Sequence, residues 1–151
     1  MHEKTNGKRI VVGVDGYDSS ITALREAQRI ATATGARVDA VGCWTVPHVA
    51  EPSYALSQID FEAGSRQLLK DSVDKAFAGQ TPENVSARLI NGYPRQALIK
   101  ASEDAEMLVL GRRGHGGFVG MLLGSVTMAC VAHAHCPVLV VRDTVSPDSG
   151  K

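Results

Sequence analysis

Short apolar runs alternate with amphipathic stretches along the whole chain. The runs are rich in β-branched and small residues, and a continuous apolar run of this length is typical of a strand buried on both faces of a parallel sheet. A further run, Val85–Ile90, alternates between apolar and polar residues and is also typical of a strand. The other four predicted strands are Arg9–Val14, Val38–Trp44, Met107–Leu110 and Val138–Val141.

Apolar residues recur at helical spacing between these strands. The first predicted helix takes Asp18, Ser19 or Ser20 as its N-cap and ends at Gly35, a residue that suits the C′ position. A loop is predicted over Pro47–Ser57 because of its composition. The later helices are predicted over Phe61–Ala76, from Pro94 (at the first helical position) to Ala101, and from Gly124-Ser125 to about His135.

Strands that alternate with helices form βαβ units, so the sequence predicts a single α/β domain with a parallel sheet. Right-handed crossovers place every loop that follows a strand at the same edge of that sheet. Ligands bind there, at the point where the strand order reverses. We therefore expect the functional residues in the loops after the first, second and fourth strands.

Six glycines crowd the segment after the fourth predicted strand. Glycine lets backbone N–H groups approach a ligand, and successive N–H groups form an anion nest. Ser125 follows at a helix N-terminus, where the helix dipole favours phosphate. No Lys precedes a Ser or Thr in this segment and residue 119 is Val, so neither a Walker A loop nor a dinucleotide fingerprint is present. The alternative is an ordinary surface loop. The glycines are Gly111, Gly114, Gly116, Gly117, Gly120 and Gly124.

Composition narrows the class of protein. The 151 residues suit one domain, and 16 basic side chains balance 16 acidic ones, which excludes a strongly basic nucleic-acid binder. No apolar stretch approaches the ~20 residues that cross a bilayer, and the N-terminus lacks a secretory signal. The three cysteines have no CxxC spacing, which argues against a zinc knuckle. We expect a cytoplasmic protein that binds neither nucleic acid nor membrane.

The pattern Gly111-x2-Gly114-x9-Gly124-Ser125 resembles the nucleotide-binding signature of the universal stress protein family. Further landmarks of that family appear in its order, so the resemblance covers residues 8–142, with residues 1–7 and 143–151 as flexible tails. It implies a Rossmann-like five-stranded parallel sheet of order 3-2-1-4-5 that binds ATP. The further landmarks are Val11–Gly16 with Ser19-Ser20, Gly92-x-Pro94, Met107–Gly111 and Cys136–Val141.

The resemblance also implies which residues contact the nucleotide. Asp15 faces the ribose or a phosphate-bound Mg²⁺, for which a carboxylate is a suitable ligand; the alternative is an Asp-Gly turn residue. Cys43 aligns with a position whose backbone contacts adenine; the alternative is a small core residue. For Arg112, Arg113 and His115 the alternative is a solvated surface. The whole implied set is Gly13, Val14, Asp15, Cys43, Leu110, Gly111, Arg112, Arg113, Gly114, His115, Gly116, Gly117, Gly124, Ser125 and Val126.

The last predicted helix and strand raise two more expectations. His133 and His135 lie near the end of the helix, where they favour its dipole more than they favour a metal site. The stretch Val126–Ala132 is apolar nearly all round, so we expect it to be buried on most sides. If Val138, Leu139, Val140 and Val141 form the edge of the sheet, pairing with a second chain would shield them, and the family commonly forms homodimers this way.

The sequence thus predicts an ATP-binding, nucleotide-dependent stress-response regulator that acts as a homodimer with an unknown signalling partner. A second hypothesis is slow ATP hydrolysis or autophosphorylation, although no residue for positioning water stands out. A third is an interaction scaffold without nucleotide. A fourth is another ligand in the same cleft, such as a cyclic nucleotide.

Overall fold

Five parallel strands form one sheet in the computed structural model, which describes residues 7–46, 54–112 and 122–142. The strands are hydrogen bonded in the order β3-β2-β1-β4-β5, so the order reverses between β1 and β4. The predicted α/β fold and strand order are confirmed. The strands are β1 (Arg9–Gly13), β2 (Arg37–Trp44), β3 (Val85–Asn91), β4 (Met107–Gly111) and β5 (Val138–Val141).

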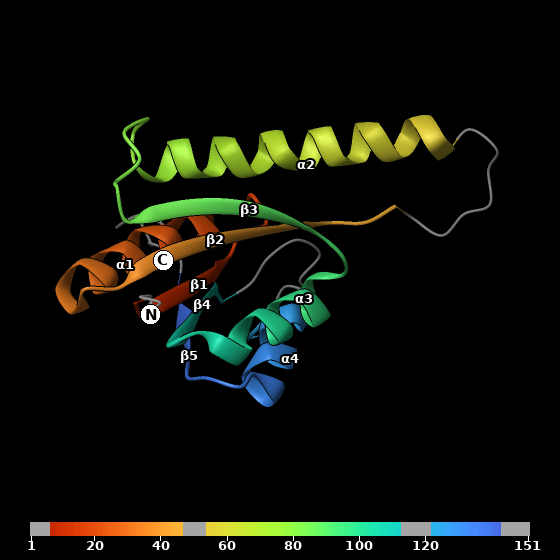
Figure 1. Cartoon of the computed structure of the whole chain (residues 1–151). Helices are drawn as coiled ribbons and strands as arrows, with labels where there is room; N and C mark the ends of the chain where they lie inside the picture. Colours follow the sequence, from red (N-terminus) through yellow and green to blue (C-terminus); the bar gives the residue numbers. More distant parts are fainter. Residues whose placement is uncertain (1–6, 47–53, 113–121, 143–151) are drawn as a thin grey trace, which may run out of the picture.

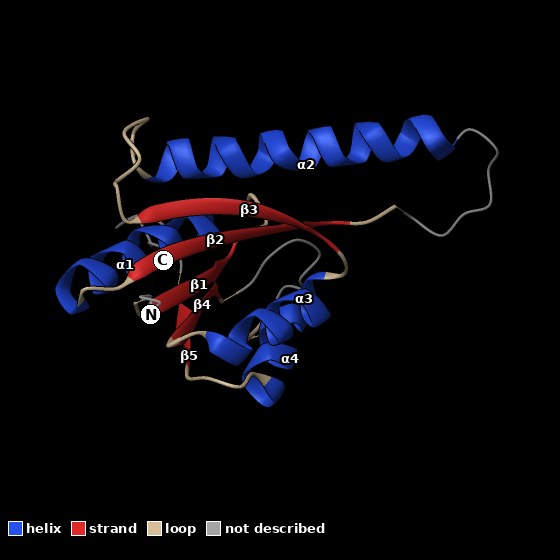
Figure 2. Cartoon of the chain, viewed as in Figure 1, coloured by secondary structure: helices blue, strands red, loops and turns tan. Residues whose placement is uncertain are grey.

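Helices cover both faces of the sheet (Figures 1 and 2). Helices α1 (Asp18–Thr34) and α2 (Tyr54–Ala76) pack on one face over a core that includes Val12 and Val38. The opposite face carries α3 (Pro94–Ala101), the short helix η1 (Ser102–Asp104) and α4 (Ser125–His133), over a core that includes Val11 and Leu108. Because β1 and β4 have core on both faces, their sequences are continuous apolar runs.

The ends of the first helix follow the predicted chemistry only in part. Gly35 adopts a left-handed conformation (φ 75°) at the C-cap of α1, as predicted. The N-cap position belongs to Tyr17, so the prediction that Asp18, Ser19 or Ser20 holds it is wrong. Ser20 lies within the first turn instead, where its hydroxyl donates to the Tyr17 carbonyl oxygen at 3.0 Å. Pro94 occupies the start of α3 as predicted.

Helix α2 is longer than its apolar pattern indicates. It begins at Tyr54, so the predicted loop over 47–57 is wrong for residues 54–57, and its residues 47–53 lie outside the described chain. Residues 58–61 of the helix are all exposed, which explains why this part has no apolar periodicity. In Figure 1 the helix runs along β3 and continues past the ends of the strands.

Helix α4 is more exposed than expected. Its buried residues are Thr127 and Cys130, whereas Met128 and Val131 are 49% and 50% exposed. The helix packs against α3 and β5 near one edge of the sheet, so its other side has no neighbour among the described elements. His133 is the last residue of α4, and His135 lies beyond the end of the helix.

A buried carboxylate fastens three of the strands on the α3 side. Asp39 of β2 is only 7% exposed and accepts hydrogen bonds from Arg9 of β1 and Arg88 of β3. Arg9 also pairs with Asp104 at the end of η1. Since a buried carboxylate is unfavourable unless it is paired, these arginines account for an acidic residue in the middle of a central strand.

No helix within the described residues combines the length and the apolar character that a membrane span requires.

Two glycine substitutions should shift stability in opposite directions. Gly35→Ala forces a Cβ into a left-handed conformation and should lower the free energy of unfolding by about 1 kcal/mol. Gly64→Ala lies inside α2, where a Cβ meets no atom within 4 Å, and should raise it by about 0.5–1 kcal/mol. Urea denaturation of the wild type and both variants measures the free energy of unfolding. A change in the same direction for both variants would contradict the backbone conformation described here.

Candidate functional site

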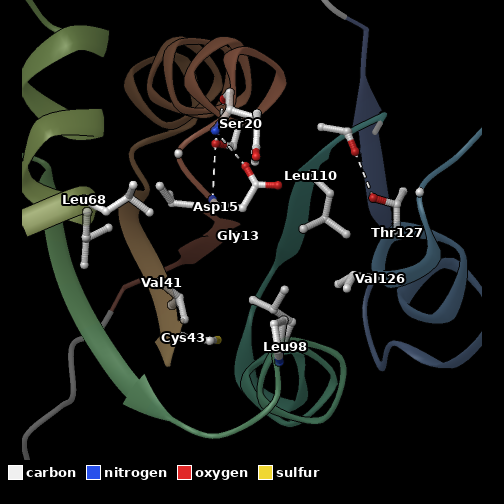
Figure 3. A pocket seen from close by; sticks show the side chains of 18 of the residues that line it. Gly13, Asp15, Ser20, Val41, Cys43, Leu68, Leu98, Leu110, Val126 and Thr127 are labelled. Atoms are coloured by element: carbon white, nitrogen blue, oxygen red, sulfur yellow. Dashed lines mark hydrogen bonds between the residues drawn. The ribbon is translucent and has the colours of Figure 1, made fainter. Parts of the chain in front are cut away.

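A cavity of about 680 Å³ lies at the carboxyl ends of the strands, where the strand order reverses. Its walls come from the ends of β1, β2 and β4, from α2, and from the first turns of α1, α3 and α4 (Figure 3). Its size is typical of a small-molecule site. The lining residues are Gly13, Val14, Asp15, Gly16, Tyr17, Ser20, Val41, Gly42, Cys43, Ser65, Leu68, Leu69, Pro94, Leu98, Leu110, Gly111, Gly124, Ser125, Val126 and Thr127.

The turn after β1 holds Asp15 at the centre of the cavity. One carboxylate oxygen, Oδ1, accepts a hydrogen bond from the Tyr17 N–H at 3.0 Å, and the Asp15 N–H donates to Ser20 Oγ at 3.3 Å. In Figure 3 the other carboxylate oxygen points across the cavity toward β4 and α4. Asp15 is therefore both a turn residue and a cavity residue, so the two readings of the sequence are compatible.

Helix α2 packs against the turn that follows β1. Gly16 has φ 88°, a conformation that favours glycine, and a Cβ on it would lie 2.9 Å from both Leu68 Cδ atoms. Leu68 thus packs directly over the turn that carries Asp15. A side chain at position 16 would require the Leu68 side chain to move and would strain the backbone at φ 88°.

The end of β4 is fixed by close contacts with two helices. A Cβ on Gly111 would lie 2.5 Å from Ser19 Cβ and 2.8 Å from the Ser19 carbonyl carbon. Thr127 Oγ1 donates to the Gly111 carbonyl oxygen at 2.8 Å. Gly111 therefore lets α1 approach β4, and its carbonyl anchors the first turn of α4.

Arg112 joins the two ends of the glycine-rich segment. Its N–H donates to the Val141 carbonyl and its carbonyl accepts from the Gly124 N–H, both at 2.8 Å. Its Nη1 donates to the Leu122 carbonyl at 3.3 Å, while its buried Nε has no hydrogen-bond partner among the described residues. Arg112 thus holds the beginning and the end of the glycine-rich segment together. It is not among the residues that line the cavity.

The two ends of the cavity differ in chemistry. The end beside β2 and α3 is apolar, with Val41, Leu98 and Cys43 (Figure 3). The other end is formed by Gly124 and the first turn of α4, whose N–H groups have no acceptor within the helix. Asp15 lies between them and is the one charged side chain among the described lining residues.

Nine of the fifteen predicted contacts meet in this cavity. Arg112 lies at the start of the glycine-rich segment and does not line the cavity. The other five, Arg113, Gly114, His115, Gly116 and Gly117, lie outside the described residues. The nine are Gly13, Val14, Asp15, Cys43, Leu110, Gly111, Gly124, Ser125 and Val126.

Sequence reasoning missed the contribution of α2 and two hydroxyl groups. Leu68 and Leu69 line the cavity from a helix whose placement over the site has no local signal. Ser20 and Thr127 are 3% and 6% exposed and hydrogen bond to backbone atoms of the cavity wall. A hydroxyl in an apolar helical stretch, as at Thr127, was the available signal, since a buried hydroxyl needs a partner.

Burial controls the chemistry of the cavity thiol. Burial raises the pKa of Cys43 to about 11, against a smaller lowering effect of Arg88. The same cause raises the pKa of Cys130 to about 11, and all three cysteines are free thiols. At neutral pH Cys43 is therefore a neutral wall residue and a poor nucleophile.

No cluster of three or more His, Cys, Asp or Glu side chains that could hold a metal occurs in the described part of the chain. Asp15 contributes a single carboxylate. That arrangement fits Mg²⁺ bound through the phosphates of a ligand, because Mg²⁺ typically uses one or two carboxylates together with phosphate oxygens and water.

The model of the universal stress protein family matches residues 7–142. A universal stress protein of Methanocaldococcus jannaschii is 34% identical over 142 residues, covering 89% of this chain and 82% of the relative. Several mycobacterial relatives are longer, and the chain spans 45–49% of their length.

Solved structures agree with this match. The universal stress protein UspA of Lactobacillus plantarum has a TM-score of 0.75 at 23% identity, over 92% of this chain and all of that one. A universal stress protein solved in complex with cAMP has a TM-score of 0.66 at 28% identity, over 91% of this chain and 98% of that one.

The raised pKa predicts slow modification of Cys43. At pH 8, about three pH units below the pKa, the thiolate fraction should be on the order of 0.1%, and the alkylation rate should rise about tenfold per pH unit. Iodoacetamide labelling followed by peptide mass spectrometry measures the rate for each cysteine in the folded protein. Modification of Cys43 as fast as free cysteine at pH 7.5 would contradict its described burial.

Proposed function

The chain belongs to the universal stress protein family, and we propose that it binds ATP with Mg²⁺ in the cavity between β1 and β4, as a nucleotide-dependent regulator. The observation that carries the proposal is the contrast between the two ends of the cavity. An apolar slot at one end and a helix N-terminus at the other suit a ligand with a ring at one end and an anion at the other. A nucleotide has this form.

The phosphate end is assigned to the start of α4. Gly124 is the N-cap, and the N–H groups of Ser125, Val126 and Thr127 form the first turn. These groups and the helix dipole favour an anion. The Thr127–Gly111 hydrogen bond keeps this turn at the end of β4. On the resemblance alone, Arg112, Arg113, Gly114, His115, Gly116 and Gly117 stay proposed contacts; the unpartnered Nε of Arg112 suits an anion nearby.

Asp15 is proposed to face Mg²⁺ or the ribose. No cationic side chain lines the described part of the cavity, and a carboxylate there would repel a polyphosphate. Mg²⁺ would supply the positive charge that lets the phosphates and Asp15 share one site. The turn fixed by Ser20 and Tyr17 holds the carboxylate in place for this role.

The base end is assigned to Val41, Gly42, Cys43 and Leu98, beside the floor at Gly13. A Cβ on Gly13 would lie 2.7 Å from Leu110 Cδ2 and 2.9 Å from Leu98 Cδ1. A glycine at this position therefore leaves room for the two leucine side chains at the floor of the cavity. A relative at 28% identity is named as a complex with cAMP, which supports an adenine nucleotide here. It also keeps a cyclic nucleotide as the alternative ligand, which competition against ATP would reveal.

We expect ATP hydrolysis or autophosphorylation to be slow or absent. Among the described lining residues Asp15 is the one carboxylate, and none is a His or Lys. Phosphoryl transfer requires a group that orients the nucleophile in addition to charge stabilisation. The three free thiols agree with the proposed cytoplasmic location, where glutathione keeps cysteines reduced.

We further propose a homodimer formed through β5. This strand is an edge of the sheet, and its residues Val138–Val141 are all partly exposed. Met128 and Val131 of the neighbouring α4 add exposed apolar surface beside the edge. An apolar edge strand is usually covered, and a second copy related by a two-fold axis would cover it.

A substitution at Ser125 tests the proposed phosphate end of the cavity independently of the base end. Ser125→Asp places a carboxylate at the start of α4, which suits the helix but competes for its N–H groups and repels phosphate. We expect ATP affinity to fall at least about tenfold (at least ~1.4 kcal/mol of binding free energy) with adenosine affinity unchanged. Calorimetric titration with Mg²⁺ of protein shown to be free of nucleotide measures both.

The matched control is Ser125→Ala, which removes the hydroxyl and keeps the N–H groups, so its ATP affinity should stay within about threefold of the wild type. Failure of the nucleotide-free wild type to bind ATP would overturn the proposed function. Equal weakening of ATP and adenosine by Ser125→Asp would place the phosphates elsewhere.

The proposed dimer predicts twice the mass of one chain in sedimentation at micromolar concentration. Val140→Glu puts a charge on the edge strand and should yield monomers. Ile59→Glu on α2, where the side chain is already 64% exposed, is the matched control and should leave the mass unchanged. A wild type that sediments with the mass of one chain would contradict the proposal.

A further inference from the structure

A second groove, of about 360 Å³, runs along β3, the other edge strand of the sheet. It is lined by five consecutive residues of the strand, Val85–Leu89. Successive side chains of a strand point to opposite faces, so a groove that touches all five must follow the edge of the strand itself. In Figure 1, α2 lies along this strand, and it supplies the other wall.

The hydrogen-bonding groups along this edge are unpaired. The Asn84 carbonyl and the Gly92 N–H both bond to β2, so the even-numbered residues between them face β2. The N–H and C=O groups of Ala87 and Leu89 therefore point into the groove. They form no hydrogen bond within the described residues. A neighbouring strand would satisfy them.

The edge also lacks the usual protection against pairing. At seven residues, β3 is longer than the four-residue edge strand β5. It contains no proline, and two of its four exposed positions, Ser86 and Ala87, are small; the other two are Arg88 and Asn91. Natural edge strands are commonly shortened, interrupted or guarded by charge. One charged residue, Arg88, lies in β3, and its Nε is held by Asp39 at 2.9 Å.

The walls of the groove define the chemistry of an occupant. Leu69 and Val73 of α2 are 5% and 6% exposed and provide an apolar wall. Three cations, Arg66, Lys70 and Arg88, line the groove against one carboxylate, Asp74. Arg66 and Lys70 pair with Glu62 and Asp74 of their own helix, but these pairs are exposed and contribute little. Apolar and acidic side chains together suit these walls.

We propose that β3 and α2 form a docking groove for an extended segment of a partner protein in which apolar and acidic residues alternate. The segment adds a sixth strand beside β3. Its backbone pairs with Ala87 and Leu89, its apolar side chains face Leu69 and Val73, and its acidic side chains face Arg88. The groove does not depend on nucleotide binding, since it lies along the strand edge and shares only Leu69 with the cavity.

A fluorescein-labelled decapeptide of alternating valine and glutamate tests the groove by fluorescence anisotropy with the full-length protein. We expect saturable binding and slower hydrogen exchange of the Ala87 and Leu89 amides. The same peptide with an N-methyl group on every residue keeps every side chain but has no backbone N–H on either edge, so it should bind at least tenfold more weakly. An alternating valine–lysine peptide should bind more weakly as well.

Variants of the protein locate the contact. Ala87→Pro removes an outward N–H that β2 does not use and should weaken binding at least tenfold, whereas Ala87→Ser should leave it unchanged. The double variant Arg66→Glu, Lys70→Glu changes side chains that are 63% and 68% exposed, and the negative charge added to the α2 wall should weaken binding of the acidic peptide relative to the basic one. Thermal denaturation confirms that each variant is folded.

Three outcomes would overturn the proposal. One is the absence of binding by the folded wild type up to millimolar peptide. Another is equal binding of the plain and N-methylated peptides, a comparison that needs no variant to fold. The third is a wild-type dimer that Ala87→Pro dissociates, since a second copy of the chain would then be the occupant of this edge.

Discussion

The close approach of α1 to the end of β4 is the constraint on which the site depends. It requires a residue without a side chain at position 111, because a Cβ there would collide with the backbone of Ser19. Ser19 and Ser20 belong to the first turn of α1, which follows the turn of Asp15 and Gly16. Gly111 thereby sets how near the loops after β1 and β4 can come, and so sets the width of the cavity between them.

That constraint is reinforced by two hydrogen bonds and one apolar contact between neighbouring elements. Ser20 holds the Asp15 N–H, Thr127 holds the Gly111 carbonyl, and Leu68 covers Gly16. Each link joins a helix to the loop at the end of a strand. The carboxylate of Asp15 and the N-terminus of α4 are therefore held by contacts within the chain itself.

The parts that follow from local sequence were predictable. Buried parallel strands need continuous apolar runs, and Gly124-Ser125 indicated the start of a helix, which is where α4 begins. The contribution of Leu68 depends on how α2 lies over the sheet, which no local pattern encodes. Met128 and Val131 were expected to be buried because a helix that is apolar all round is usually buried on most sides. Both are half exposed, since α4 lies near an edge of the sheet. The hydrogen bonds that Arg112 makes to Val141, Leu122 and Gly124 join segments far apart in the sequence, so no local pattern predicted them.

The β3 edge of the sheet and the cavity are separate surfaces that both border on α2. Leu69 of this helix is buried, lines the cavity at the end of β2, and also lines the groove beside β3. Leu68, one residue earlier, covers the turn of Asp15. Leu68 and Leu69 are neighbours on one helix, so the position of α2 over the sheet shapes a wall of each surface. In this fold, the helix with the weakest sequence signal is the element that the cavity and the groove have in common.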